Sequence, residues 1–244
     1  MKFEKGPMTY EGKAKKIFQV VGEPEMVWVE YKDSLTAFNA QKKSSFEGKG
    51  EINSQITKIL FETLKKSGVP HHLVEFMSPI DVVCKKVKII PLEVVVRNVL
   101  AGSTAKKLGI EEGKPLSKPL VEFYLKDDDL GDPFVSDDQA LAIGASSSNE
   151  ELQELKSLAL SVNQCLLQVF SEIGIRLVDF KIELGRDGSG QILLADEISP
   201  DTCRLWDLST GEKLDKDRFR RDLGQVKESY EEVLKRLTQW SEKQ

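Results

Sequence analysis

The chain has 244 residues and a formal net charge of −5, with 31% charged and 40% hydrophobic residues. These values are typical of a globular protein that buries a core without disulfides or a structural metal. The acidic balance argues against bulk nucleic-acid binding, and no apolar run reaches the roughly 18 residues of a membrane span. Residues 1–5 are followed by no signal-peptide core, so we expect a cytoplasmic location.

Cysteine and histidine are too few and too scattered to indicate a metal or thiol centre. Three cysteines, Cys84, Cys165 and Cys203, lie far apart in the sequence. The imidazoles are His71 and His72 alone. This usage argues against a zinc site and against a Cys/His nucleophile.

In chain order, short strands are predicted at residues 17–21 and 26–31, and then a helix that stops at Gly68. Strands at residues 82–90 and 92–98 are expected to be separated by Pro91, and Ser103 is expected to cap a short helix. The remaining elements are a loop at residues 113–135, a long helix from a capping box at Ser148 and Glu151 to Gly174, a hairpin at residues 176–206 and a final amphipathic helix from Leu223 to Leu237. Strands at both ends around central helices predict an α+β fold.

The hairpin is the most informative segment, because residues 176–184 alternate strictly between apolar and polar side chains. This alternation predicts a half-buried strand. Its apolar face would carry Val178, Phe180, Ile182 and Leu184, and its polar face Asp179, Lys181 and Glu183.

A second strand is predicted at residues 192–197, after turn residues at 186–190. If Glu183 pairs opposite Leu194, Asp196 is its diagonal neighbour at roughly 7–8 Å, where two carboxylates can hold a divalent cation. A register shift of one residue would place them on opposite faces. A merely solvated strand face is the alternative interpretation.

Several other segments combine glycine with basic residues, which is typical of anion sites. Lys13 and Lys15 flank Ala14 after a glycine, although the spacing is not that of a P-loop and a basic turn is the plainer interpretation. Lys49 lies between Gly48 and Gly50 before a helix, where an exposed loop is an equal alternative.

Arginines supply the strongest anion-binding signals. Arg97 ends an apolar strand shortly before Ser103, an arrangement that suits a phosphate or carboxylate, although a structural acid could be its partner. A later cluster indicates an anionic small-molecule substrate, unless Lys216 and Arg220 are only solvated helix neighbours. The members of this cluster are Asp201, Arg204, Lys216, Arg218, Arg220 and Arg221. The acidic run at residues 127–129 is predicted to be a solvated loop, and Asp132 before Pro133 is less ordinary.

Together these segments resemble the SAICAR synthetase (phosphoribosylaminoimidazole-succinocarboxamide synthase) family. They follow the family order over nearly the whole chain, and their combination is far more specific than any one of them. The matching stretches are YEGKAKKIF at 10–18, GKGEIN at 48–53, PLEVVVRNVLAGS at 91–103, DPF at 132–134, LVDFKIELG at 177–185, LADEISPDTCRLWD at 194–207 and DKDRFRRDLG at 215–224.

The resemblance implies an ATP-grasp-like, two-lobed α+β architecture. Residues 1–88 would form a β-rich nucleotide-binding lobe, and residues 89–244 an α+β lobe with the substrate and metal site. The implied reaction joins L-aspartate to carboxyaminoimidazole ribonucleotide through an acyl phosphate, with ATP and Mg²⁺, in de novo purine synthesis. The implied partners are these small molecules, with no nucleic acid or membrane; a homo-oligomer stays an open alternative, because the sequence does not give the oligomeric state. A small-molecule kinase, or a non-catalytic nucleotide-binding protein on a related frame, remains the alternative.

The resemblance also assigns roles to individual residues. Lys13, Ala14 and Lys15 would line the nucleotide phosphates, and residues 82–87, with Lys85, would pass the adenine. Lys13, Lys15, Lys181 and Asp179 are the catalytic candidates. Glu183 and Asp196 would hold Mg²⁺, and the imidazole nucleotide would be bound by Arg97, Ser103, Arg204, Lys216 and Arg220.

One segment departs from the family pattern. Residues 35–42 read LTAFNAQK where many relatives have a Gly-Asp-Gly-like turn, so no contact is assigned to residues 36–40. No motif assigns residues to the aspartate site.

Overall fold

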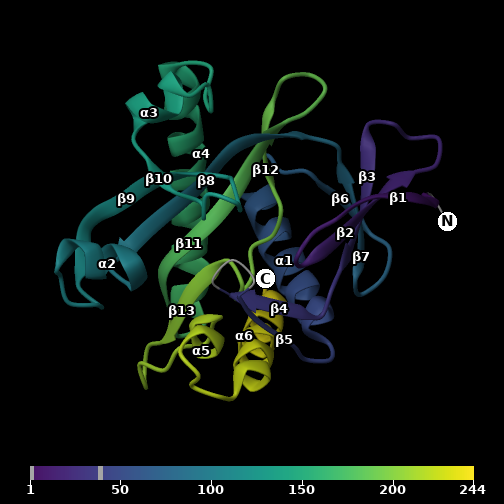
Figure 1. The fold of residues 1–244 in the computed structure, drawn as a ribbon. Helices are drawn as coiled ribbons and strands as arrows, with labels where there is room; N and C mark the ends of the chain where they lie inside the picture. Colours follow the sequence, from purple (N-terminus) through teal and green to yellow (C-terminus); the bar gives the residue numbers. More distant parts are fainter. Residues whose placement is uncertain (1–2, 38–40) are drawn as a thin grey trace.

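The computed structural model describes residues 3–37 and 41–244. The N-terminal part folds into a small antiparallel sheet, seen at the right of Figure 1. Strand β3 begins and ends at the predicted residues. In spatial order the strands are β1 (Lys5–Glu11), β2 (Lys15–Val20), β3 (Met26–Tyr31), β7 (Asp81–Lys85) and β6 (Leu73–Phe76).

A larger antiparallel sheet forms the centre of the molecule (Figure 1). Its longest strands, β8 and β11, lie side by side and have twelve residues each. In spatial order the strands are β10 (Phe134–Val135), β9 (Pro115–Leu125), β8 (Lys88–Val99), β11 (Ile175–Arg186) and β12 (Ile192–Ala195), and β13 (Cys203–Asp207) also pairs with β11.

Two strands share one edge of β11. β13 pairs with its first half, from Ile175 to Phe180, and β12 pairs with its last part, from Glu183 to Arg186. Residues 196–202 connect β12 to β13 and leave the sheet between them. There the backbone N–H of Lys181 donates to the carbonyl oxygen of Thr202 at 2.8 Å.

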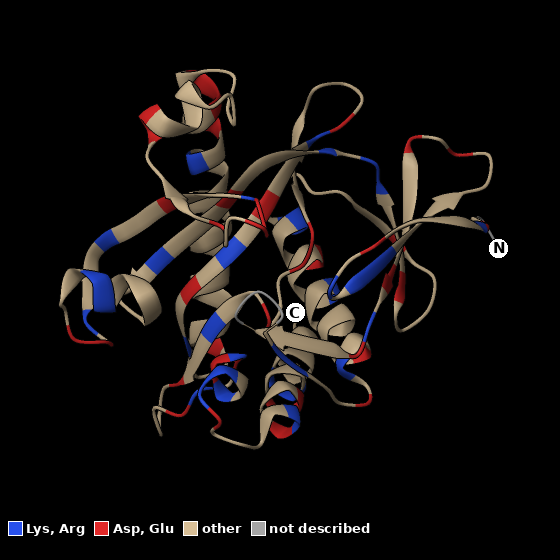
Figure 2. Cartoon of the chain, viewed as in Figure 1, with Lys and Arg blue, Asp and Glu red and all other residues tan. Residues whose placement is uncertain are grey.

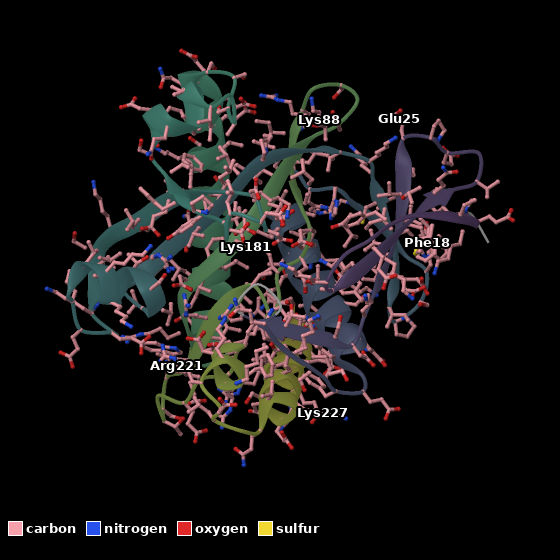
Figure 3. The ribbon with its side chains drawn as sticks, in the orientation of Figure 1. Phe18, Glu25, Lys88, Lys181, Arg221 and Lys227 are labelled. Atoms are coloured by element: carbon pink, nitrogen blue, oxygen red, sulfur yellow. The ribbon has the colours of Figure 1, made fainter. Side chains whose placement is uncertain are left out.

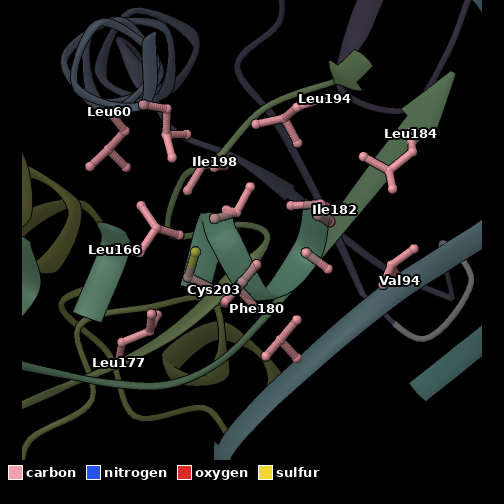
Figure 4. Packing of buried hydrophobic residues seen from close by; sticks show 14 of the residues in the cluster. Leu60, Val94, Leu166, Leu177, Phe180, Ile182, Leu184, Leu194, Ile198 and Cys203 are labelled. Atoms are coloured by element: carbon pink, nitrogen blue, oxygen red, sulfur yellow. The ribbon is translucent and has the colours of Figure 1, made fainter. Parts of the chain in front are cut away.

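The main core lies where the helices α1, α4 and α6 meet the large sheet. Figure 4 shows Leu60 of α1 and Leu166 of α4 packing near Phe180 and Ile182 of β11. The segregation of antiparallel sheets and helices confirms the predicted α+β class. The helices are α1 (Lys49–Lys66), α2 (Gly102–Leu108), α3 (Asp137–Ala142), α4 (Asn149–Glu172), α5 (Asp217–Arg220) and α6 (Val226–Ser241).

The predicted hairpin forms, but its register differs by one residue from the predicted one. Glu183 pairs with Ala195 rather than with Leu194. The predicted second strand is also too long, because β12 ends at Ala195 and Asp196 adopts a left-handed backbone with φ of 62°. Because Asp196 lies outside β12, the alternation of side chains along a strand does not determine the side of the sheet on which its carboxylate lies.

The predicted apolar face of β11 is wrong at one position. Val178 packs with Val99 and Ala101 in a separate cluster, whereas its neighbour Leu177 joins the main core. The pairing with β13 shifts between Leu177 and Asp179. A β-bulge at this point breaks the two-residue period, which resumes at Asp179.

Pro91 does not separate two strands as predicted. It lies inside β8, and the break before this strand is at residues 86–87. The β8–β11 register is irregular between Glu183 and Gly185, next to Pro91, where a residue without an N–H is tolerated. The loop predicted at residues 113–135 is also wrong, because it contains β9 and β10.

Some of the helix ends have the capping residues that the sequence predicts, and one does not. Gly68 and Gly174 are left-handed residues just beyond α1 and α4, and the Ser148 side chain caps α4. Ser103, in contrast, caps nothing: α2 has Ala101 at its N-cap and no side-chain cap. The N–H of Gly102 instead donates to the Glu112 carboxylate at 3.1 Å.

A small hairpin surrounds the segment that departs from the family pattern. It consists of β4 (Ser34–Ala37) and β5 (Lys42–Ser45), and residues 38–40 between them lie outside the described residues. Among the helices that the structure describes, none has the length and apolar character needed to cross a membrane.

Candidate active site

A cavity of about 730 Å³ lies between the small sheet and the large sheet. All of the predicted site residues except Ser103 line it. They come from the β1–β2 turn, β7, β8, β11, the β12–β13 connection, β13 and the region of α5. These residues are Lys13, Ala14, Lys15, Lys85, Arg97, Asp179, Lys181, Glu183, Asp196, Arg204, Lys216 and Arg220.

Ser103 is exposed on α2 and is not among the residues that line the cavity. The preceding Gly102 nevertheless contacts Arg204, since a side chain on this glycine would lie 2.5 Å from the Arg204 guanidinium. A role for Ser103 in binding substrate therefore stays a prediction.

One wall of the cavity is apolar. Val29, Val82 and Cys84 form a buried cluster on one face of the small sheet and line the cavity. Burial raises the pKa of the Cys84 thiol to about 12, and it raises that of Cys203, which also lines the cavity, still further. Both thiols are therefore protonated at neutral pH and are poor nucleophiles.

The opposite wall carries charge, and Figure 2 shows acidic and basic segments alternating along β11. Lys181 lies in the middle of this strand, at the centre of Figure 3. Its Nζ donates to Glu93 at 2.8 Å and to Glu183 at 3.1 Å. Burial alone would lower the pKa of Lys181, but the carboxylates of Glu183 and Glu93 raise it, so the side chain stays an ammonium.

The two predicted metal ligands are both engaged by lysines. Lys126 Nζ donates to Glu183 at 2.8 Å, and Lys15 from the small sheet donates to Asp196. Burial opposes ionisation of Asp196, but Lys15 and Lys181 outweigh it and hold the pKa of this carboxyl below its ordinary value. Asp196 is therefore a carboxylate at neutral pH.

The donor set fits magnesium, although it is incomplete without a substrate. Within residues 3–37 and 41–244, no group of three or more His, Cys, Asp and Glu side chains is arranged to hold a metal. Magnesium commonly takes one or two carboxylates and completes its shell with water and substrate phosphates. The next residue, Glu197, pairs with Lys15 through Oε1 at 2.8 Å, and its Oε2 atom is buried with no hydrogen-bond partner among the described residues, so one further carboxylate oxygen is available next to Asp196.

His72 supports the unusual backbone of Asp196. Its Nε2 atom lies 3.3 Å from the Asp196 carbonyl oxygen, within reach for the N–H to donate. Burial lowers the pKa of His72 to about 4, so the ring is neutral at pH 7. The ring thus fixes the point at which the chain leaves β12.

Two residues before Lys181 on β11, Asp179 joins two arginines. Its Oδ2 accepts from Arg97 at 2.6 Å and from Arg204 at 2.8 Å. Arg97 is 4% exposed and donates also to Glu122 at 2.6 Å. Arg97 therefore has structural acids as partners, as the alternative interpretation expected, and it also lines the cavity.

Lys49 is neither an exposed loop residue nor part of the cavity lining. It is 1% exposed and pairs with Asp201, which also accepts from Tyr230 at 2.7 Å. The Lys216 Nζ atom lies 3.9 Å from the same carboxylate. Burial lowers the pKa of Lys216 while Asp201 opposes that shift. Asp201 thus ties a cavity-lining lysine to α1 and α6.

Asp215 makes the stability of this region depend on pH. Burial, with the nearby charge of Asp217, raises the pKa of Asp215 from 3.8 to about 7. The folded chain therefore binds a proton that the unfolded chain releases between these values, and this contribution to stability is lost as pH rises towards 7. We expect the free energy of unfolding to fall by about 3 kcal/mol more between pH 5 and pH 8 than it does in Asp215→Asn. Urea denaturation at both pH values measures the difference, and parallel pH profiles would contradict the assignment.

The sequence does not predict some of the residues that line the cavity. Thr36 and Ala37 line the cavity although no contact is assigned there, and Lys126 lines it although it falls in the loop predicted at residues 113–135. Glu93 faces Lys181 from the neighbouring strand. Lys126 directly follows β9, which the sequence does not predict. A strand predicted there would have placed Lys126 at its end rather than within a loop.

Comparison with known proteins identifies the family of this chain. The family model for SAICAR synthetase matches residues 8–237. A phosphoribosylaminoimidazole-succinocarboxamide synthase from Halalkalibacterium halodurans is 55% identical over 97% of this chain and 99% of its own length. The crystal structure of such a synthase from Ehrlichia chaffeensis superposes with a TM-score of 0.91 at 44% identity, covering 95% of this chain and 98% of that one. A SAICAR synthetase in complex with ADP has a TM-score of 0.90 at 43% identity, covering 96% and 97%. Because these matches span nearly the whole chain, it belongs to the SAICAR synthetase family.

Proposed function

We propose that this chain joins L-aspartate to carboxyaminoimidazole ribonucleotide at the expense of ATP, forming SAICAR, ADP and phosphate. The observation that carries the proposal is that one cavity is lined both by Lys13 and Lys15 and by Arg204, Lys216 and Arg220. Such a cavity offers separate cationic regions for two phosphorylated substrates. The ADP complex of a 43% identical relative supports a nucleotide as one of them.

The polar face of β11 sets the arrangement of the substrates. Asp179, Lys181 and Glu183 follow one another along one face, so Asp179 and Glu183 are roughly 13 Å apart along the strand. Arg97 and Arg204 both pair with Asp179. An imidazole nucleotide with its phosphate near these arginines can extend along this face. Its carboxylate then approaches Glu183 and Asp196.

ATP would occupy the other part of the cavity. The adenine would lie against the apolar wall that contains Val82 and Cys84, with its phosphates near Lys13 and Lys15. Glu183 and Asp196 would hold Mg²⁺ in this ATP-grasp-like arrangement of residues 1–88 and 89–244. When bound, the ion supplies positive charge to the transferring phosphoryl group.

The chemistry requires activation of a poor electrophile. A carboxylate does not release oxide to an amine, so we infer that its oxygen first attacks the γ-phosphorus of ATP and ADP leaves. The aspartate amine then attacks the acyl phosphate, and phosphate leaves with that oxygen. Such transfer needs positioning and charge neutralisation rather than a protein nucleophile. The protonated thiols of Cys84 and Cys203 and the charged Lys181 agree with this requirement.

Oxygen transfer tests the mechanism directly. With both carboxylate oxygens of the imidazole nucleotide labelled with oxygen-18, we expect one label in the released phosphate and one in the amide after a single turnover. Mass spectrometry of both products gives the result. Unlabelled phosphate from a completed turnover would rule out the acyl phosphate.

Substrate dependence separates the ligase from the small-molecule kinase. Sustained release of ADP should require both the imidazole nucleotide and aspartate. If ADP release continues at the full rate without aspartate, with a phosphorylated product accumulating, the chain is a kinase rather than a ligase.

A further inference from the structure

Asp217 lies behind the substrate cavity and touches two of the residues that line it. The side chain is 1% exposed, and Asp217 itself is not part of the cavity lining. Its Oδ2 accepts from Arg204 Nε at 3.0 Å, and its Oδ1 accepts from the Arg220 guanidinium at 2.6 Å. One buried carboxylate therefore holds two guanidinium groups that face the cavity.

The position of Asp217 is itself fixed by the backbone. Its N–H donates to the Asp215 carboxylate at 2.7 Å, and the N–H of Leu205 donates to the same carboxylate at 2.7 Å. Leu205 directly follows Arg204 on β13. Asp215 thus ties the start of α5 to the strand that supplies Arg204, and the distance between the Asp217 carboxylate and Arg204 is set on both sides.

Arg204 is confined from two further directions. Asp179 accepts its NH1 group at 2.8 Å. Gly102 has a left-handed backbone with φ of 61°, and a Cβ atom there would lie 2.5 Å from Arg204 NH2. The absent side chain leaves the space that this nitrogen occupies.

Two guanidinium groups around one carboxylate form a preorganised site for a dianion. Without Asp217, the like charges of Arg204 and Arg220 would repel each other; Arg204 would keep its contact to Asp179, but Arg220 would have to be ordered when substrate binds. We propose that Asp217 is a positioning residue that holds Arg204 and Arg220 as one binding pair for the phosphate of the imidazole nucleotide, with Gly102 leaving room for Arg204. This inference rests on the proposed function and adds to it a residue that does not touch substrate.

The test is Asp217→Asn, which keeps the size of the side chain but replaces one acceptor oxygen by a donor group. Only one of the two contacts that Asp217 makes to Arg204 and Arg220 can then persist. We expect the KM and the calorimetric Kd for the imidazole nucleotide to rise about tenfold or more, as for loss of a charge-assisted hydrogen bond, with the KM for ATP unchanged.

Asp207→Asn is the matched control. Asp207 is also buried, at 6% exposure, and accepts from Arg236 at 2.7 Å, but it does not line the cavity. The control should reduce thermal stability and leave every KM unchanged. A rise in all KM values with Asp217→Asn, or a rise in none, would overturn the positioning role.

Two further variants keep the test decisive if Asp217→Asn does not fold. Gly102→Ala displaces Arg204 without removing a charge, so a folded Gly102→Ala with a normal KM for the imidazole nucleotide would refute the confinement of Arg204. In an Arg220→Met background, Asp217→Asn should have a clearly smaller effect than alone, because the pair is already broken. If the effects of Asp217→Asn and Arg220→Met on binding of the imidazole nucleotide are fully additive, Arg204 and Arg220 do not act as a pair.

Binding to the unaltered chain separates failure of the positioning role from failure of the proposed function. If it binds the imidazole nucleotide but the variants bind equally well, only the positioning role fails. If it shows no calorimetric binding of the imidazole nucleotide, the proposed function itself fails.

Discussion

Replacing Asp196 by asparagine is expected to lower the turnover number by about a hundredfold or more, as for loss of an electrostatic contact to the transition state. The substitution removes one charge from the proposed magnesium pair and keeps the size of the side chain. Asparagine also tolerates the left-handed backbone at this position, with φ of 62°, so the variant should fold. Steady-state assays at saturating ATP and a range of Mg²⁺ concentrations measure the effect.

Asp222→Asn provides a matched control for this variant. Asp222 has a similar backbone, with φ of 54°, and pairs with Lys42 at 2.6 Å on the surface, away from the cavity lining. It undergoes the same chemical change and should keep normal turnover. If Asp196→Asn also retains near-normal turnover at limiting Mg²⁺, Asp196 is not a metal ligand.

Arg97→Met should cause the largest loss of stability among the cavity variants. Arg97 lies between the carboxylates of Glu122 and Asp179, each at 2.6 Å, and all three side chains are nearly buried. Removing one partner of a buried ion pair typically costs about 3–5 kcal/mol, because it leaves uncompensated charge. We expect a decrease of this size in the free energy of unfolding, measured by urea denaturation.

Arg204→Met should separate binding from stability. Asp179 keeps Arg97, and Asp217 keeps Arg220, so no carboxylate is left without a cation. The expected loss is about 1.5–3 kcal/mol of binding energy for the imidazole nucleotide, with little change for ATP. If Arg97→Met and Arg204→Met destabilise the fold equally, or if only ATP binding weakens, the division of roles between them is wrong.

The sequence predicts which side chains face the cavity together where chemistry and local periodicity coincide. Asp179, Lys181 and Glu183 alternate with apolar residues, so they share a face whatever strand pairs beside them. The same periodicity fails at Val178, because the bulge depends on how β13 pairs with β11. Strand register is a property of two segments together, and a single segment does not contain it.

Exposure explains the missed strand β9. Its first six residues, from Pro115 to Leu120, are all exposed or half-buried, so no buried face imposes an alternation between apolar and polar side chains. Its backbone is ordered by pairing with β8 rather than by its own side chains. The same long-range dependence applies to Gly102, whose N–H is satisfied by Glu112 rather than by the adjacent Ser103.

The short stretch from Asp179 to Glu183 has a consequence for how this chain can change in length. Asp179 pairs with the arginines, Lys181 lies at the centre, and Glu183 is a proposed metal ligand. These residues are two apart in sequence on one pleated face. An insertion or deletion of one residue inside it would turn the later groups to the opposite side of the sheet, and one of two residues would change their spacing. Length variation in this region should therefore be confined to the turn at residues 187–190 and to the bulge before Asp179. Homologous chains that differ in size should keep this stretch free of gaps.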